Sequence, residues 1–202
     1  MGDLMSYKIT AKQKLEKLLD NPKFNVPQSV KDGLRNGTYT VTPKVYHVIK
    51  AVNGVNKINM IALSDTADDT LCNLNNAKIT NGTYAFIHNV CVESGETSET
   101  DATVANAVNS VTFGKLAPAL QLGVTNLKFG KQEVYEKTSN SIFNSKMEIC
   151  AVDNGDVEFV PRMIDDKTNI DLEVSWRTAA NAKTFMRVKL LALVVTANTI
   201  GL

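Results

Sequence analysis

Histidine, tryptophan and cysteine are scarce in this sequence of 202 residues, which contains two, one and three of them, respectively. Serine- or cysteine-based catalysis needs a base, usually histidine, beside the nucleophile. His47 and His88 each lie within an apolar run that predicts a strand, where a histidine with one satisfied hydrogen bond is the common case. No G-x-S-x-G turn and no glycine-rich phosphate loop occurs. We therefore expect a protein that is not an enzyme and that binds no cofactor.

Metal-ligand spacing is also missing from the sequence. Zinc takes four cysteine or histidine ligands at close spacing, whereas Cys72, Cys91 and Cys150 are dispersed and form no C-x-x-C pair. An odd number of cysteines favours free thiols in a reducing compartment. Carboxylates gather at 65–69 and at 93–101, but not with the spacing of a calcium loop. We therefore expect solvated loops in both places and predict no metal, with calcium as the open alternative.

Long hydrophobic runs and aromatic residues are lacking too. The most apolar stretch, residues 188–197, is interrupted by Lys189 and is half as long as the roughly 20 residues that a membrane helix needs. No membrane span is therefore expected, and the first ten residues do not resemble a secretory signal. Aromatic residues make up 6% of the chain, which argues against a carbohydrate-binding platform.

Positive charge is concentrated at the start of the chain, although the net charge is only +1. The first 50 residues contain nine lysines and arginines against four acidic residues, a difference of +5. Such a segment can contact nucleic acid phosphates or an acidic neighbouring subunit, or it can be a solvated helix face. The candidate contact residues are Lys8, Lys12, Lys14, Lys17, Lys23, Lys31 and Arg35.

The same segment predicts helical structure. Leu15, Leu18 and Leu19 share one face of a helix over 11–20, which ends at Asn21 because Pro22 follows. A second short helix is predicted over 28–34. We therefore expect residues 1–36 to form a basic, helical N-terminal arm.

From residue 37 onward, short runs of Val, Ile, Thr, Tyr and Phe are divided by Gly, Asn, Asp and Pro. This pattern predicts a mainly β domain over 37–202, either a β-sandwich or a barrel. The predicted strands are 38–42, 45–51, 57–63, 83–93, 110–113, 125–129, 133–137, 146–152, 157–160, 169–177 and 184–196, with a hairpin turn at 153–156.

Two strands give the clearest patterns. Residues 170–177 alternate strictly between apolar and polar, which predicts one face in the core and one in water. Residues 190–195 are apolar on both faces, so a helix, an arm or a neighbouring subunit must cover the second face. Leu191, Leu193 and Val195 are therefore candidates for a subunit interface.

These strands, together with two repeated turn phrases, resemble the β-sandwich structural proteins of virions. Asn-Gly-Thr-Tyr occurs at 36–39 and 81–84, and Phe-Gly-Lys occurs at 113–115 and 129–131. The resemblance is architectural and covers residues 38–197, with 83–93, 170–177 and 185–195 as its strongest parts. The proteins that the sequence resembles are bacteriophage-type capsid proteins, and the resemblance implies an antiparallel β-sandwich with a jelly-roll-like fold.

The resemblance implies a capsid or coat subunit that forms a homo-oligomer and contacts other virion proteins. Such a protein is made in the host cytoplasm and located in the virion, and its basic arm can contact the genome without reading its sequence. Two alternatives remain open at this stage. One is a phage tail-tube or head-decoration protein, and the other is a non-viral β-sandwich module that binds a carbohydrate or another ligand.

Overall fold

The computed structural model describes residues 19, 26–68, 70–97, 108–144 and 157–198, without the side chains of 157–161. Of the predicted first helix only Leu19 falls within these residues, and the predicted strand at 146–152 and hairpin turn at 153–156 lie outside them. The described part is mainly β, with two four-stranded antiparallel sheets, as the strand pattern predicts.

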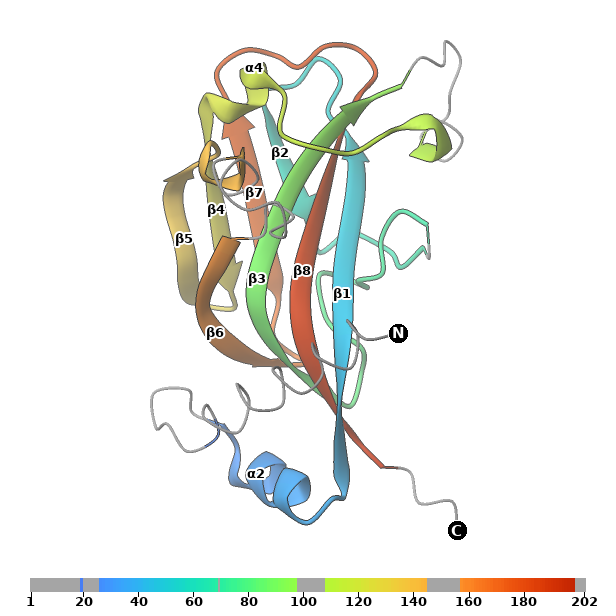
Figure 1. The fold of residues 1–202 in the computed structure, drawn as a ribbon, viewed down its shortest axis with the longest axis vertical. Helices are drawn as coiled ribbons and strands as arrows, with labels where there is room; N and C mark the ends of the chain where they lie inside the picture. The colour runs from blue at the N-terminus through green and yellow to red at the C-terminus, as the bar shows by residue number, and fades with distance from the viewer. Residues whose placement is uncertain (1–18, 20–25, 69, 98–107, 145–156, 199–202) are drawn as a thin grey trace, which may run out of the picture.

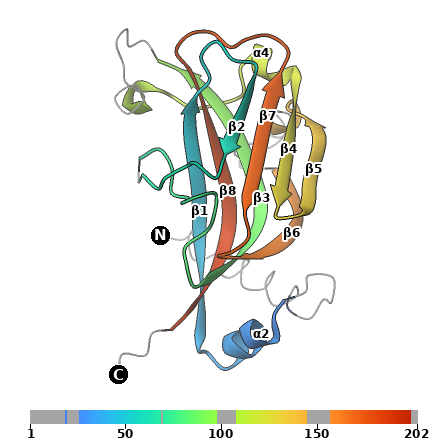
Figure 2. The ribbon, with the colours of Figure 1, turned by 180° about the vertical axis from the view of Figure 1, so that it is seen from behind.

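The first sheet has the order β1 (Tyr39–Ala51), β8 (Thr184–Ala197), β3 (Thr83–Glu96) and β6 (Val157–Asp165), as Figure 1 shows from its outer side. The second sheet has the order β2 (Lys57–Ile61), β7 (Ile170–Trp176), β4 (Gly123–Phe129) and β5 (Gln132–Ser139). This sheet faces the viewer in Figure 2. The pairings are nested, because β1 pairs with β8, β2 with β7, β3 with β6 and β4 with β5.

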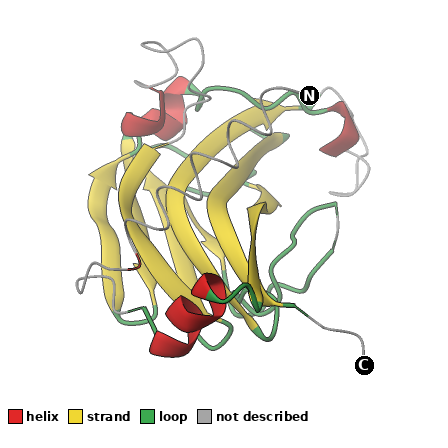
Figure 3. Ribbon diagram, turned by 60° about the horizontal axis from the view of Figure 1, so that its bottom comes forward, coloured by secondary structure: helices red, strands yellow, loops and turns green. Residues whose placement is uncertain are grey.

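Helices are short and lie at the ends of the sheets, as Figure 3 shows: α2 (Gln28–Arg35), α4 (Pro118–Gln121) and the 3-10 turn η2 (Val108–Ser110). The predicted second helix is confirmed as α2. The strand predicted over 110–113 is wrong. That segment leaves η2 and crosses the end of β3, where Ser94 and Gly114 exchange two backbone hydrogen bonds of 3.0 and 3.3 Å.

Strand β7 confirms the alternating pattern. Ile170, Leu172, Val174 and Trp176 are buried in the core between the sheets, while the residues between them face outward. The same core takes inward-facing side chains from strands of both sheets, so the two sheets pack face to face as a sandwich-like pair of layers. Trp176 retains only 4% of its exposure.

Strand β8 is apolar on both faces because both are covered within this chain. Leu190, Ala192 and Val194 point into the core, and Leu193 and Val195 point to the outer side. Helix α2 lies against that outer side through Val30, which is fully buried in the same cluster. Of the covers that the sequence allows, α2 is the one that the structure places over these two residues.

Strand β1 runs unbroken where two strands are predicted, at 38–42 and 45–51. Its residue Pro43 has no N–H, but the peptide nitrogens of odd-numbered residues here face away from β8, because the His47 N–H donates to Asn73, outside the sheet. Asn73 closes this edge: its Oδ1 accepts from the His47 N–H at 2.7 Å, and its Nδ2 donates to the Val45 carbonyl at 2.8 Å. An edge strand closed in this way tolerates proline.

Gly33 tests how closely α2 packs on β1. A methyl group at this position would lie 2.2 Å from the ring of Tyr39. Although alanine favours a helix over glycine by about 1 kcal/mol, we expect Gly33→Ala to lower the free energy of unfolding by about 1–3 kcal/mol through overcrowding. Chemical denaturation measures the effect. Ser29→Ala, at an exposed position of the same helix, is the control and should not destabilise; an equally neutral Gly33→Ala would contradict the close contact.

Candidate assembly surfaces

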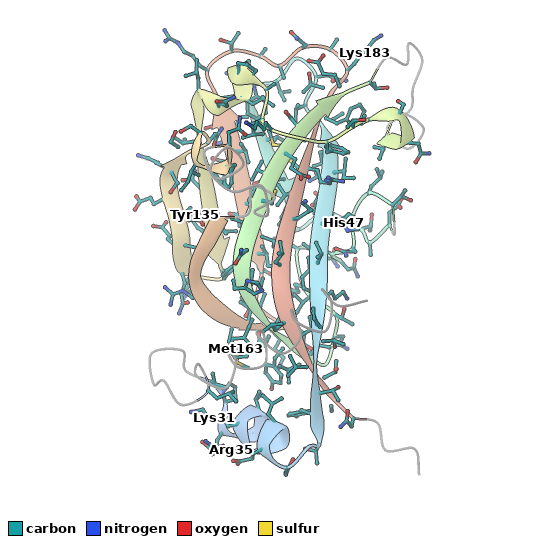
Figure 4. The ribbon with its side chains drawn as sticks, in the orientation of Figure 1. Lys31, Arg35, His47, Tyr135, Met163 and Lys183 are labelled. Carbon is teal, nitrogen blue, oxygen red and sulfur yellow. The ribbon has the colours of Figure 1, made fainter. Side chains whose placement is uncertain are left out.

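The basic residues predicted to contact a partner fall into two groups. Lys31 and Arg35 are four residues apart on α2, at the bottom of the molecule in Figure 4. Arg35 is exposed and Lys31 is half-buried. The other candidates, Lys8, Lys12, Lys14, Lys17 and Lys23, lie outside the described residues.

The three apolar residues predicted as a subunit interface do not form one exposed surface. Leu193 and Val195 are 3% and 1% exposed because α2 of the same chain covers them. Leu191 is half-buried and lies between Val45 and Asn89 in neighbouring strands. In this arrangement a second copy can reach Leu191, but it can reach Leu193 and Val195 only if α2 moves.

Charged residues occupy the middle of the same sheet face. Glu93 on β3 is 5% exposed and accepts hydrogen bonds from Arg187 Nε at 2.6 Å and Lys189 Nζ at 2.9 Å, both on β8. The Arg187 guanidinium carbon lies 4.4 Å from the centre of the Phe113 ring. A carboxylate this deeply buried requires such pairing, since an isolated buried charge is costly.

His47 lies next to this group, directly across from Lys189 in the pairing of β1 with β8. Burial lowers the pKa of His47 below its usual 6.5, and the Arg187 charge lowers it further, whereas a hydrogen bond with the backbone of Thr70 opposes the shift. Since these causes together lower the pKa, the neutral imidazole is favoured in the folded protein.

The other histidine, His88, places Nδ1 2.6 Å from the side-chain oxygen of Asn89. Among the residues that the structure describes, no three His, Cys, Asp or Glu side chains are grouped to hold a metal ion. Within the same residues, no helix is both long and apolar enough to span a membrane.

The end of the molecule opposite α2 carries two of the four large apolar side chains that are exposed among the described residues. We define the apical surface as residues 52–56, 118–122 and 177–183, three segments that meet at the top of Figure 1. Leu122 is 70% exposed and Val55 is 40% exposed. These segments contain Arg177 and Lys183 but no carboxylate, and Lys183 marks this end in Figure 4.

Hydrogen bonds hold the apical surface in shape. The Arg177 N–H donates to the Leu122 carbonyl at 3.0 Å, and the Ala180 N–H donates to the Val55 carbonyl at 3.1 Å. The fully buried Asn140 donates to the carbonyls of Leu120 and Ser175 at 2.8 and 3.0 Å, and so ties α4 to β7. The two exposed apolar side chains are therefore presented by a fixed backbone.

No protein family model, curated protein or solved structure matches this chain. Function must therefore be inferred from the fold and from the surfaces described above.

Neither the buried charges nor the apical surface is predicted from the sequence. Arg187 and Lys189, two residues apart in an apolar strand, do signal cations on one strand face, but their partner Glu93 becomes visible only once the register of β3 and β8 is known. Val55 and Leu122 each adjoin a glycine, Gly54 and Gly123. Gly54 lies in a turn with a φ angle of +68°, whereas Gly123 is the first residue of β4, so an adjoining glycine does not by itself signal an exposed apolar residue.

Replacing Glu93 tests whether the buried charges stabilise the sheet. Glu93→Gln keeps the side-chain shape but leaves Arg187 and Lys189 without an anion, so we expect the free energy of unfolding to fall by about 2–3 kcal/mol. Denaturant titration measures the change. Glu173→Gln, which removes the partner of exposed Lys57 on the second sheet, should cost less than about 1 kcal/mol. Equal effects of the two substitutions would argue against a special role for Glu93.

His47 predicts a pH dependence of stability. Because the pKa of His47 is lower in the folded than in the unfolded chain, the unfolded state binds more protons as pH falls through 6.5. The contribution of neutral His47 to the free energy of unfolding is therefore present above pH 6.5 and is lost as the pH falls below this value. Thermal unfolding should show a smaller loss of melting temperature between about pH 7.5 and 5.5 for His47→Gln than for the unaltered protein. The matched control is His88→Gln, and an unaltered loss in the His47 variant would contradict the prediction.

Proposed function

We propose that this chain is a structural virion protein, a capsid or coat subunit of the jelly-roll kind that assembles with copies of itself. The nested strand pairing carries this proposal. An eight-stranded antiparallel ribbon that is folded over itself pairs first with last, second with seventh, third with sixth and fourth with fifth, which is the order found here. Double-sheet jelly rolls of eight strands recur in viral capsid and lectin domains.

The position of the single tryptophan favours a coat subunit over a carbohydrate-binding module that holds its sugar by aromatic stacking. Trp176 packs in the core between the sheets and offers no exposed ring on which a sugar could stack. A phage tail-tube or head-decoration protein differs from a coat subunit mainly in the symmetry of the assembly. Both remain within the structural class that we propose.

The apical surface is our candidate for contact between copies and with other virion proteins. Exposed apolar side chains with a polar rim are typical of interaction sites, and arginine is enriched in such interfaces. Leu122 and Val55 supply the apolar area, and Arg177 and Lys183 supply the rim. Leu191 is a secondary candidate on the sheet face.

At the opposite end, we propose that α2 and the basic residues that precede it face the genome. Lys31 and Arg35 project from the end of the molecule farthest from Lys183 in Figure 4. Lysine and arginine neutralise phosphates without reading sequence, so this contact is non-specific and weakens with salt. A virion location follows from the same proposal, and it requires no cofactor.

Assembly of the purified chain tests the proposal. Light scattering and electron microscopy at micromolar concentration, over a range of salt, should detect closed particles or regular polymers. We expect Leu122→Asp to abolish assembly while it changes the free energy of unfolding by less than about 0.5 kcal/mol, because the side chain is exposed in the monomer.

Leu63→Asp is the matched control. Leu63 is 61% exposed but lies outside the apical surface, just after β2, so its replacement should leave assembly intact. A chain that stays monomeric under all conditions would count against the coat proposal. If Leu122→Asp assembles as well as the Leu63→Asp control, the apical surface is not the contact between copies. Tubes in place of closed shells would favour the tail-tube alternative.

A further inference from the structure

A polar crevice lies between the connection from β2 to β3 and the turn that follows β6. Its volume is about 430 Å³, within the range of small-molecule sites, and it opens to solvent. Most of its lining comes from residues 67–81, and the turn after β6 adds one residue. The charged and amide side chains in this lining are Asn73, Asn75, Asn76, Asn81, Lys78 and Asp166.

The crevice has a hydrogen-bonded frame. Asn75 and Lys78 exchange backbone hydrogen bonds of 3.0 and 3.4 Å across a tight turn, and the Asn76 N–H donates to the Asp65 carbonyl at 2.7 Å. On the other side, the Gly82 N–H donates to Asp166 Oδ2 at 2.7 Å. The walls are therefore set before any ligand arrives.

The turn directs asparagine side chains outward. Asn76 and Ala77 have φ angles of +50° and +57°, a left-handed conformation that asparagine adopts more readily than most residues. Ala77 is 1% exposed, and its carbonyl accepts from the Ile170 N–H at 2.8 Å, so its side of the turn is fixed in the core. Asn75 and Asn76 are consequently exposed on the opposite side.

Several polar groups of the crevice are uncommitted. Among the described residues, the side-chain amides of Asn75, Asn76 and Asn81 and the ammonium of Lys78 make no hydrogen bond to another group. Each amide offers two donors and one acceptor, and the ammonium offers three donors. Ile79 also borders the crevice, but it is 4% exposed and its side chain packs in the core.

We propose that this crevice binds a polyhydroxylated ligand, namely a sugar ring of a glycan. A hydroxyl group both donates and accepts, so it matches side-chain amides, while Lys78 donates to a ring or hydroxyl oxygen and Asp166 accepts. Because no aromatic ring belongs to the lining, hydrogen bonds supply most of the affinity, and binding to a single ring is weak.

None of the residues that line this crevice belongs to the apical surface or to α2, and the site adds a recognition function to the proposed structural one. A coat subunit with such a crevice would carry a glycan-recognition site on every copy. The binding is independent of assembly, and a chain that never assembles can still show it.

Titration of the isotope-labelled chain with methyl glycosides of glucose, galactose, mannose and N-acetylglucosamine tests the site by nuclear magnetic resonance. At least one glycoside should cause saturable shifts of the amide signals of residues 73–82 and 166. The double substitution Asn76→Ala with Lys78→Ala should weaken that binding about tenfold or more, since it removes two hydrogen-bonding side chains.

Asn59→Ala, at an exposed position on β2, is the matched control and should leave the affinity unchanged. Unaltered signals elsewhere in the spectrum establish that each variant is folded. Absence of shifts with all four glycosides, or equal affinity in the double variant, would overturn the proposal. Shifts of the same amides with inorganic phosphate and not with the glycosides would reassign the crevice to an anion and would also overturn it.

Discussion

The structure depends on one strand that must be covered on every side. Strand β8 is hydrogen-bonded to β1 along one edge and to β3 along the other, and it contributes apolar side chains to both faces of its sheet. One face closes the core and the other holds α2 through Leu193 and Val195. The position of α2, the depth of Glu93 and the pairing of the first sheet all follow from this strand.

The two outer faces of the molecule differ in consequence. On the first sheet, α2 covers one end, η2 and Phe113 cover the other, and the charges of Glu93, Arg187 and Lys189 are packed between them. On the second sheet, the outward side chains of β7 are Asp171, Glu173 and Ser175, which remain in contact with water. The buried ion pairs of the first sheet hold β3 and β8 in register, whereas the polar side chains of the second sheet mainly keep its surface hydrated.

Local patterns are readable from the sequence, and long-range ones are not. The alternation in β7 and the helix α2 follow from neighbouring residues, and so they are predicted correctly. The segment 110–113 has β-forming residues but crosses β3 at Gly95, where a side chain would meet the Thr112 carbonyl at 2.5 Å; that contact decides its conformation. The pairing of Glu93 with Arg187 and the convergence of the crevice residues with Asp166 depend on strand register and on loop placement, which composition and periodicity do not encode.

The nested order has a consequence for biosynthesis. In the first sheet β8 lies between β1 and β3, and its residue Ala197 pairs with Tyr39 near the other end of the sequence. On the ribosome, β1 and β3 must wait for β8 to be translated before they can join one sheet, whereas β4 and β5 form a local hairpin early. Non-local pairing of this kind folds slowly and leaves strand edges open to other nascent chains. A chaperone that shields β1 and β3 during translation would protect these strand edges until β8 is available to pair with them.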